Sequence, residues 1–411
     1  MENVTISGKY IPLYLVVILL NCPSFLYSSF IIYETSTDFA GGDYANLVFN
    51  YSLINLILLV WGIVVFKANM KIPNFYYLLL LVLLKDIILY FCGNHFSLKS
   101  WEMYLSLATG MSCCSIVANT SKSYRCFEKL IDWLIIANFI WQILFIVTGR
   151  VGESGRVSVM GQGAGSVGFM YAMEIVYILV YRLKEKKGLV LLCLSLFGIV
   201  ISGSRFSLII VFVSLFFFHG QLLKNYSRKM KITFILLLTV LGLGVTYTLL
   251  NAELQNQYAI IERMSGMYNA NEMADDQSLL ERIESFSVGL SLIPTHPLGL
   301  SFTYGDLQWN MIYGGFFAFP HSTILCYYLF WGPIMIYCIY WLIKYIFISR
   351  RLKLSKEKNM LLYLLLIFII YGGVCISTKD VVFHIALLAV IMRRVLTEKD
   401  KMKHSYHMIK S

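Results

Sequence analysis

An apolar run from Gly188 to His219 constrains the fold of this chain most, because an arginine, Arg205, stands in its middle. The run is too long for one membrane span, which needs about 20 residues, and short for two. Lysines and arginines cluster at both of its ends, and such clusters stay on the cytoplasmic side. A single crossing would put one cluster outside. The run is therefore predicted to form a hairpin of two short helices that turns at Ser202–Ser204.

Arg205 would then lie at the outer mouth of the hairpin, next to Ser204. A guanidinium group at that depth is costly unless it faces protein, water or an anion. We therefore treat Arg205 as a candidate functional residue. The alternative is a structural cap whose side chain reaches the lipid headgroups.

The composition is typical of a polytopic membrane protein. Of 411 residues, 58% are hydrophobic and 14% are charged, and the mean hydropathy is +0.70. The net charge of +11 does not indicate nucleic-acid binding, because the basic residues lie on alternate loops and chain ends. The nine cysteines are scattered without a C-x-x-C pair, so a metal site or disulfide framework has no support.

Hydropathy predicts an all-α fold with about twelve membrane spans, in one transmembrane domain over residues 1–411. Basic residues fall on the predicted inside segments, while the first outside loop, residues 34–45, is acidic. Both termini are therefore predicted to be cytoplasmic. The predicted spans are Tyr10–Tyr33, Asn46–Phe66, Phe75–Cys92, Trp101–Ala118, Leu130–Thr148, Gly165–Tyr181, Gly188–Ile201, Phe206–His219, Ile232–Leu250, His321–Ile348, Met360–Ile376 and Val381–Leu396.

One connection, residues 251–320, is predicted to lie outside and is too long for a plain linker. Within it, residues 278–293 place apolar side chains on one face of a helix, which Pro294 and Pro297 are expected to end. Such a helix is predicted to lie on the outer bilayer surface or to pack across the tops of the spans. The apolar face consists of Leu279, Ile283, Phe286, Leu290 and Ile293.

Three cationic or titratable residues converge on the outer side by this topology: Arg205, Arg282 and His321. Arginine binds phosphate oxygens in bidentate fashion, so two arginines could hold a lipid-linked diphosphate and stabilise it as leaving group. A histidine with a pKa near neutral could deprotonate an incoming hydroxyl group. This set describes glycosyl transfer from a lipid diphosphate carrier, and His296 supplies a second histidine in the same loop.

Each of these residues also has a structural alternative. Arg282 could be a solvated residue or pair with Glu281 or Glu284, His321 could be an interfacial cap, and His296 could be an ordinary loop residue.

Charged residues also occur inside predicted spans: Lys85 and Asp86 in the third and Glu174 in the sixth. Buried charges form pairs or line a cavity. We expect Lys85 to form a structural ion pair with an acidic group. A role in a substrate path or a proton relay is the alternative.

Four motifs follow one another in a set order: Ile201–Arg205, Arg282-Ile283, His296–Phe302, and His321–Leu325 before Gly332. In order and spacing, from about residue 160 to 335, the chain resembles the bacterial O-antigen polymerase and ligase superfamily of membrane glycosyltransferases. It departs from the family pattern at two positions. Ser322 stands where the family often has Asn, and Ser301 stands where a second glycine is common.

The resemblance implies a lipid-dependent glycosyltransferase fold with a large outer loop over a lateral lipid entrance. It implies an undecaprenyl-diphosphate-linked oligosaccharide donor, transfer with inversion, and no required metal or cofactor. Arg205 and Arg282 would be the diphosphate-binding arginines, and His321 the histidine often assigned as base. Ser204 and His296 are further candidate substrate-binding residues, and a chain-length regulator is a further candidate partner.

The polymerase and the ligase share these motifs. A polymerase adds a growing chain to a new lipid-linked repeat unit, whereas a ligase moves the finished chain to a lipid A core. We favour the polymerase, in the bacterial cytoplasmic (inner) membrane, because the abundance of Phe, Tyr and Ile resembles polymerases of serotype clusters. A flippase or secondary transporter is the alternative from another class, although no inverted repeat is evident. A non-enzymatic assembly factor is a further one.

Overall fold

The computed structural model describes part of the chain and divides into two compact units. One unit comprises Met1–Leu134 and Glu284–Ser411, and the other comprises Ile135–Ile283. The described residues form helices, turns and no strand, as the predicted all-α fold requires. They are residues 77–93, 121–147, 164–182, 185–202, 207–208, 210–212, 214, 277–301, 312, 322–372, 387–388 and 390–402.

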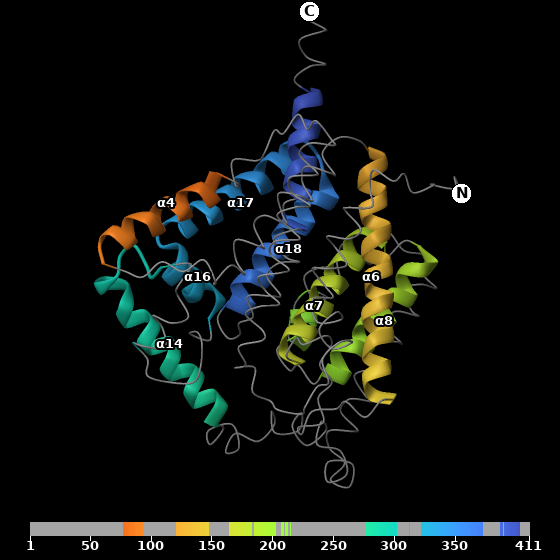
Figure 1. Cartoon of the computed structure of the whole chain (residues 1–411). Helices are drawn as coiled ribbons and strands as arrows, with labels where there is room; N and C mark the ends of the chain where they lie inside the picture. The colour runs from red at the N-terminus through yellow and green to blue at the C-terminus, as the bar shows by residue number, and fades with distance from the viewer. Residues whose placement is uncertain are drawn as a thin grey trace, which may run out of the picture. The chain divides into compact units, whose positions relative to one another are not determined.

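The first unit is built mainly from helices that follow the long loop, together with one helix from early in the chain (Figure 1). Helix α17 packs against both α4 and α18, and α16 packs against α17 and α18. Helix α6 (Ser121–Val147) begins in this unit, and α14 (Gln277–Thr295) ends in it. Its other helices are α4 (Tyr77–Phe91), α16 (Thr323–Trp331), α17 (Ile334–Arg351), α18 (Ser355–Gly372) and the helical residues 390–402.

The second unit packs the later part of α6 against α7 (Ala164–Tyr177) and α8 (Lys186–Ser202). One π-helical turn, η3 (Ile178–Arg182), continues α7. Most of the side chains described in α7 are buried, including Tyr171 and Tyr177. Since α7 is apolar on all sides, its place at the centre of this unit follows from its composition.

Polar side chains hold these three helices in register. The Asn138 amide donates to Glu174 Oε1 over 2.8 Å. The Tyr171 hydroxyl donates to Gln142 Oε1, and Gln142 Nε2 donates to the Gly198 carbonyl, each over 3.0 Å. Asn138 contacts Glu174 of α7, whereas Gln142, one turn later in α6, contacts the earlier residue Tyr171. Along α8, by contrast, the contacts of α6 move toward later residues. Helix α7 therefore runs opposite to α6 and α8.

The direction of the helices gathers charge at one end of this unit. Arg182 ends η3 and Lys187 begins α8, and both pair with Glu185, at 3.1 and 3.2 Å. Partial burial acts to raise the pKa of Glu185, but Lys187 and Arg182 outweigh it, so this pKa lies below its ordinary value. The basic cluster predicted to precede the hairpin is therefore a local ion-pair network.

Several predicted spans coincide with helices. Helix α4 lies within one predicted span, and α8 reproduces the first arm of the hairpin to within two residues. Helix α6 starts at Ser121 rather than Leu130, and α18 starts at Ser355 rather than Met360. Both helices begin with polar residues. A hydropathy window does not count these residues as part of a span, but their backbone groups still form the hydrogen bonds of the helix.

Over the predicted span His321–Ile348 the structure shows two helices in place of one. The chain forms α16, turns at Gly332 and Pro333, and continues as α17 with a bend of 119°. Gly332 has a φ of 64°, which a glycine adopts without strain. Pro333 lacks an N–H group, so it cannot continue the hydrogen bonds of α16.

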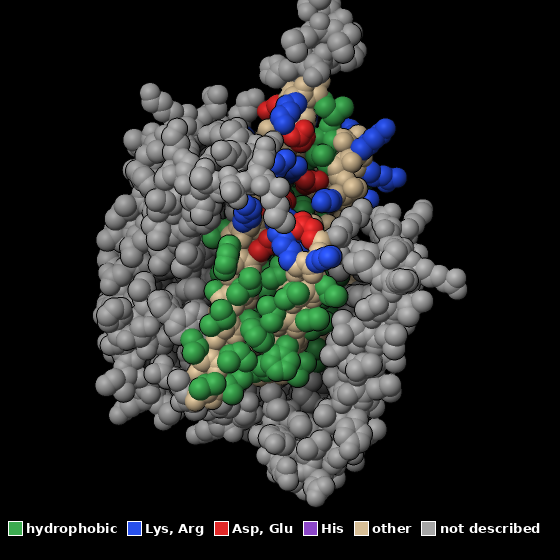
Figure 2. Space-filling model, turned by 90° about the vertical axis from the view of Figure 1, so that its right-hand side faces the viewer, with side chains coloured by type: hydrophobic (Ala, Val, Ile, Leu, Met, Phe, Trp, Pro, Cys, Tyr) green, Lys and Arg blue, Asp and Glu red, His purple; other side chains and the backbone are tan. Residues whose placement is uncertain are grey.

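Among the described residues, no single helix has both the length and the apolar composition needed to cross a membrane, but this bent pair does by length and composition. Large apolar side chains are nevertheless exposed on the helices, among them Phe91 at 81% and Trp133 at 68%. Figure 2 shows hydrophobic side chains over a broad area of one face, with charged side chains gathered toward one end. Helices that face lipid carry apolar side chains in this way.

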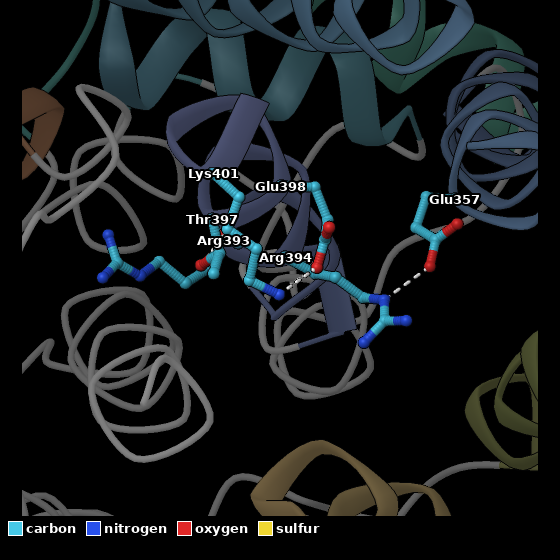
Figure 3. Close-up of polar contacts among 6 residues, drawn as sticks. All are labelled: Glu357, Arg393, Arg394, Thr397, Glu398 and Lys401. Carbon is cyan, nitrogen blue, oxygen red and sulfur yellow. Dashed lines mark hydrogen bonds and ion pairs between the residues drawn. The ribbon is translucent and has the colours of Figure 1, made fainter. Parts of the chain in front are cut away.

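Near the end of the chain, Arg394 contacts two other helices of the first unit, and Figure 3 shows its pair with Glu357. Its Nε lies 2.6 Å from Glu357 Oε1 on α18. Its guanidinium carbon lies 4.2 Å from the centre of the Tyr124 ring on α6. Glu357 is buried, so the pair is less screened than a surface ion pair. One turn further on, Lys401 pairs with Glu398 at 2.7 Å.

Replacing Gly198 by alanine is expected to destabilise the second unit. A Cβ at this position would overlap the Tyr171 ring, which is fully buried and hydrogen-bonded to Gln142. Overpacking costs about 1–3 kcal/mol, which exceeds the ~1 kcal/mol that alanine gains over glycine in a helix. Thermal unfolding of the purified protein measures the change. The control is Val200→Ala on the exposed side of α8; equal melting temperatures would contradict this account.

Candidate functional site

Most of the predicted site residues lie outside the described residues. These are Ser204, Arg205 and His321, together with the side chain of Arg282. The backbone of Arg282 lies in the early turns of α14, and His296 is described in full. The structure therefore shows the framework that carries three of the motifs: α14, the turn that follows it, and α16.

Helix α14 covers the whole of residues 278–293, where the sequence predicts a helix. It spans Gln277–Thr295, so Pro294 stands in its last turn rather than just beyond it. Proline lacks a donor and restricts the residue before it, so the helix ends one residue later. The predicted helix and its bounds are thus correct to within two residues.

The face of α14 that packs on protein is not the predicted apolar stripe. Ile283 is 59% exposed and Leu290 46% exposed. The buried side chains are those of Ser285 and Leu292, with Val288 partly buried. On a helix with 3.6 residues per turn, the centres of these two faces lie more than a quarter of a turn apart. Ile293, at the edge of the predicted stripe, also packs against this core. Ile283, Phe286 and Leu290 of the stripe are exposed. Its predicted place on the outer bilayer surface stays a prediction.

A tight turn follows α14. The His296 amide donates to the Leu292 carbonyl, and the Gly299 amide donates to the His296 carbonyl, both over 2.8 Å. The imidazole of His296 is partly exposed, and its Nδ1 lies 2.9 Å from the Thr295 hydroxyl oxygen. The turn therefore fixes the backbone of His296 and leaves its ring accessible from solvent.

This turn contacts the end of α16 through the backbone. The Leu300 amide donates to the Leu329 carbonyl. Gly299 has a φ of 78°, and a Cβ there would overlap the Leu329 carbonyl oxygen; a Cβ at Gly332 would overlap the Leu298 carbonyl oxygen. The two glycines let two turns approach more closely than side chains would allow.

An ion pair on α4, between Lys85 and Asp86, stabilises this contact between the turn and α16. Lys85 on α4 lies 3.2 Å from Asp86 Oδ1, and both side chains are buried. Its ammonium also donates to the Leu300 carbonyl over 2.8 Å and to the Phe330 carbonyl. The expectation of a structural ion pair is confirmed, with the neighbouring aspartate as the acid. Sequence reasoning missed the carbonyl partners because they lie more than two hundred residues away in the chain.

Helices α14 and α16 run in the same direction. The turn at residues 298–300 meets the end of α16, while Leu292 and Val288 pack with Leu329 and Leu325 further back. The end of α16 that follows His321 therefore lies away from the glycine contact. At that end Ser322 is the helix N-cap, whose hydroxyl accepts from the Leu325 amide over 3.3 Å.

The N-cap explains one departure from the family pattern. Asparagine and serine are about equally good caps, because each offers a side-chain oxygen to the free amides of the first turn. Ser322 in place of Asn therefore keeps the start of α16, and with it the backbone that leads from His321.

No group of three or more His, Cys, Asp or Glu residues that could hold a metal ion occurs among the described residues. The polar groups on this framework are hydrogen-bond donors, acceptors and one ion pair. These groups hold the backbone of the turn and of α16 in place.

Replacing Gly299 by alanine is expected to open the glycine contact. The substitution adds a Cβ that meets backbone at a φ that L-residues rarely adopt. We expect a lower melting temperature and loss of protection of the Leu300 amide in hydrogen exchange. Gly93 is the matched control, because it also has a positive φ, of 94°, but a Cβ there meets nothing. A Gly299→Ala variant no less stable than Gly93→Ala would contradict the role of this contact.

A comparison with protein families identifies this part of the chain. Residues 189–339 match the family described as O-antigen ligase. This stretch includes the described framework from α14 to the first residues of α17 and the predicted residues Arg205, Arg282, His296 and His321. No curated protein and no solved structure matches the chain. Over residues 189–339 the chain is therefore similar to the O-antigen ligase family, which confirms the resemblance to the O-antigen polymerase and ligase superfamily over this part of the chain.

Proposed function

We propose that the protein polymerises undecaprenyl-diphosphate-linked oligosaccharide repeat units into O-antigen or capsular polysaccharide. The observation that carries the proposal is the match of residues 189–339 to the O-antigen ligase family, since this stretch contains every predicted site residue. The reaction is inverting glycosyl transfer at the outer face of the bacterial cytoplasmic membrane, in a multi-pass protein with both termini cytoplasmic.

In this mechanism Arg205 and Arg282 bind the diphosphate of the donor. Their planar guanidinium groups pair with its oxygens and stabilise the charge that develops as the diphosphate leaves. His321 takes the proton of the acceptor hydroxyl, which attacks the anomeric carbon from the opposite face of the sugar. His296 and Ser204 contact the substrate.

The bent helix pair supports this role for His321. The break at Gly332-Pro333 makes α16 a short helix of 9 residues with its own capped start at Ser322. Its free N-terminal amides favour negative charge nearby. A histidine at this position would meet an acceptor hydroxyl where developing negative charge is tolerated.

A ligase that transfers finished chains to a lipid A core is the second candidate, because the matched family is the O-antigen ligase family. Purified protein with lipid-linked repeat units distinguishes the two. A ladder of longer lipid-linked chains, formed without any lipid A core, identifies the polymerase. Transfer that requires the lipid A core identifies the ligase.

Removal of either arginine is expected to reduce polymer formation. A lost charge-assisted hydrogen bond costs about 1.5–3 kcal/mol, or roughly ten- to a hundredfold in rate or affinity. Arg205→Ala and Arg282→Ala should both show this loss, and lysine should rescue poorly because it lacks the planar fork. Polymer amount and length measured at matched protein levels provide the readout. Arg351→Ala, at the exposed end of α17, is the control. Unchanged polymer in Arg205→Ala would refute the assignment.

His321→Ala is expected to abolish turnover while donor binding persists. A positioned base contributes about 10²–10⁴-fold. The base must be neutral, so the rate of the wild-type protein should fall as the pH drops through its pKa. A cationic histidine that only binds diphosphate would give the opposite trend. Donor binding and turnover are measured separately on the purified variant. Lost binding with normal turnover per complex would make His321 a ligand instead of a base.

A further inference from the structure

Lys85 makes a set of contacts that the proposed mechanism does not use. A lysine ammonium has three N–H donors, and here three acceptors surround it. They are the Leu300 carbonyl at 2.8 Å, the Phe330 carbonyl, and Asp86 Oδ1 at 3.2 Å. The side chain is buried, so these bonds are not exchanged for water. All three N–H donors of Lys85 thus have acceptors within the protein.

Two of these acceptors belong to opposite sides of one contact. Leu300 follows the turn after α14, and Phe330 lies in the last turn of α16. The last carbonyls of a helix have no partner within it, and a cation is favourable there. Leu300 itself also donates to the Leu329 carbonyl. Lys85 therefore bridges the backbone at Leu300 and the backbone at the end of α16. We call this contact the joint.

A second residue of α4 supports the same joint. The Ser301 hydroxyl lies 3.5 Å from Asp86 Oδ2, at the long limit of a hydrogen bond, and Ser301 is buried. Asp86 thus contacts both the ammonium of Lys85 and the residue after Leu300. A glycine at position 301 would lack this hydroxyl group.

The joint sets the direction of α16. This helix has 9 residues, or about 12 Å from end to end. A tilt of about 5° at its C-terminal end would move its N-terminal end by about 1 Å. His321 directly precedes that end. Misplacement of a reacting group by about 1 Å can cost about a hundredfold in rate.

We propose that Lys85 is a positioning residue for glycosyl transfer, which holds α16, and through it His321, at the angle that the reaction needs. The proposal rests on the proposed function. The contacts that support it are the two backbone carbonyls and the Asp86 carboxylate around a single ammonium.

The test is Lys85→Met in the full-length purified protein. Turnover at saturating lipid-linked donor should fall about tenfold or more, while the donor Kd stays within about threefold, because the arginines and not His321 bind the diphosphate. The matched control is Lys344→Met. Lys344 is a lysine of α17 whose ammonium lies 4.2 Å from the Trp341 ring. It is expected to keep wild-type turnover.

Two more variants separate positioning from folding. Lys85→Gln keeps two donors and loses the charge, so its turnover should fall between wild type and Lys85→Met; it decides the matter if Lys85→Met does not fold. Lys85→Arg should not restore turnover, because a planar fork cannot reach three acceptors arranged around one nitrogen. Full turnover per folded molecule in Lys85→Met or Lys85→Gln would overturn the proposal, as would rescue by arginine.

Hydrogen exchange gives a readout independent of activity. In Lys85→Met the Leu300 amide should exchange faster, while that of Leu325, near the start of α16, stays protected. Unchanged exchange at Leu300 would overturn the proposal. If His321→Ala and Arg205→Ala kept full activity, the proposed function would fail. Faster exchange at Leu300 would then still support the role of Lys85 in the joint.

Discussion

The contact between two glycine turns, at Gly299 and Gly332, is the constraint on which the described part of the candidate site depends. Each glycine stands where a Cβ would overlap a carbonyl oxygen of the other turn. The chain therefore brings a loop and a broken helix together through backbone, which no side-chain packing could achieve at that distance. Once the two turns meet, α14 and α16 run in the same direction, and the start of α16 is fixed relative to the loop.

Much of this framework could be predicted from local sequence. The apolar periodicity of residues 278–293 predicted the bounds of α14 to within two residues. It could do so because apolar residues recur every three or four positions along one face of a helix. The ends of α4 and α8 followed from hydropathy. The sequence also indicated an ion pair at Lys85, since a buried charge requires a partner. Such predictions succeed where the physical cause lies within a few residues.

The break in α16–α17 and the packed face of α14 depend on longer-range causes. Hydropathy averages over Gly332-Pro333 because the residues on both sides are apolar, although the two residues together end a helix. The packed face of α14 includes Ser285 and the buried Gly289, small residues that permit close approach. Hydrophobicity alone points to a different stripe of the helix. The roles of Arg205, Ser204 and His321 stay predictions, because these residues lie outside the described residues.

The structure gives each of the two departures from the family pattern a side-chain contact: Ser322 keeps one that asparagine would make, and Ser301 adds one that glycine lacks. Ser322 supplies the N-cap oxygen that an asparagine would supply. Ser301 replaces a glycine, and its hydroxyl reaches Asp86 beside Lys85. Both changes lie at the ends of the same short segment of structure, one before α16 and one at its far end. The N-cap of α16 is thus retained, and the turn gains a contact with Asp86.

Polar side chains set the position of backbone in both units, and the reason is physical. Apolar packing between helices is non-directional, and in lipid it has little hydrophobic drive. In the second unit, Gln142 bonds to both Tyr171 and the Gly198 carbonyl, four residues before α8 ends at Ser202. In the first unit, Lys85 bonds to both sides of the glycine contact. Each of these side chains bonds to backbone close to a motif. Two motifs, Ile201–Arg205 and His296–Phe302, therefore lie at or beside backbone that a buried hydrogen bond holds in place.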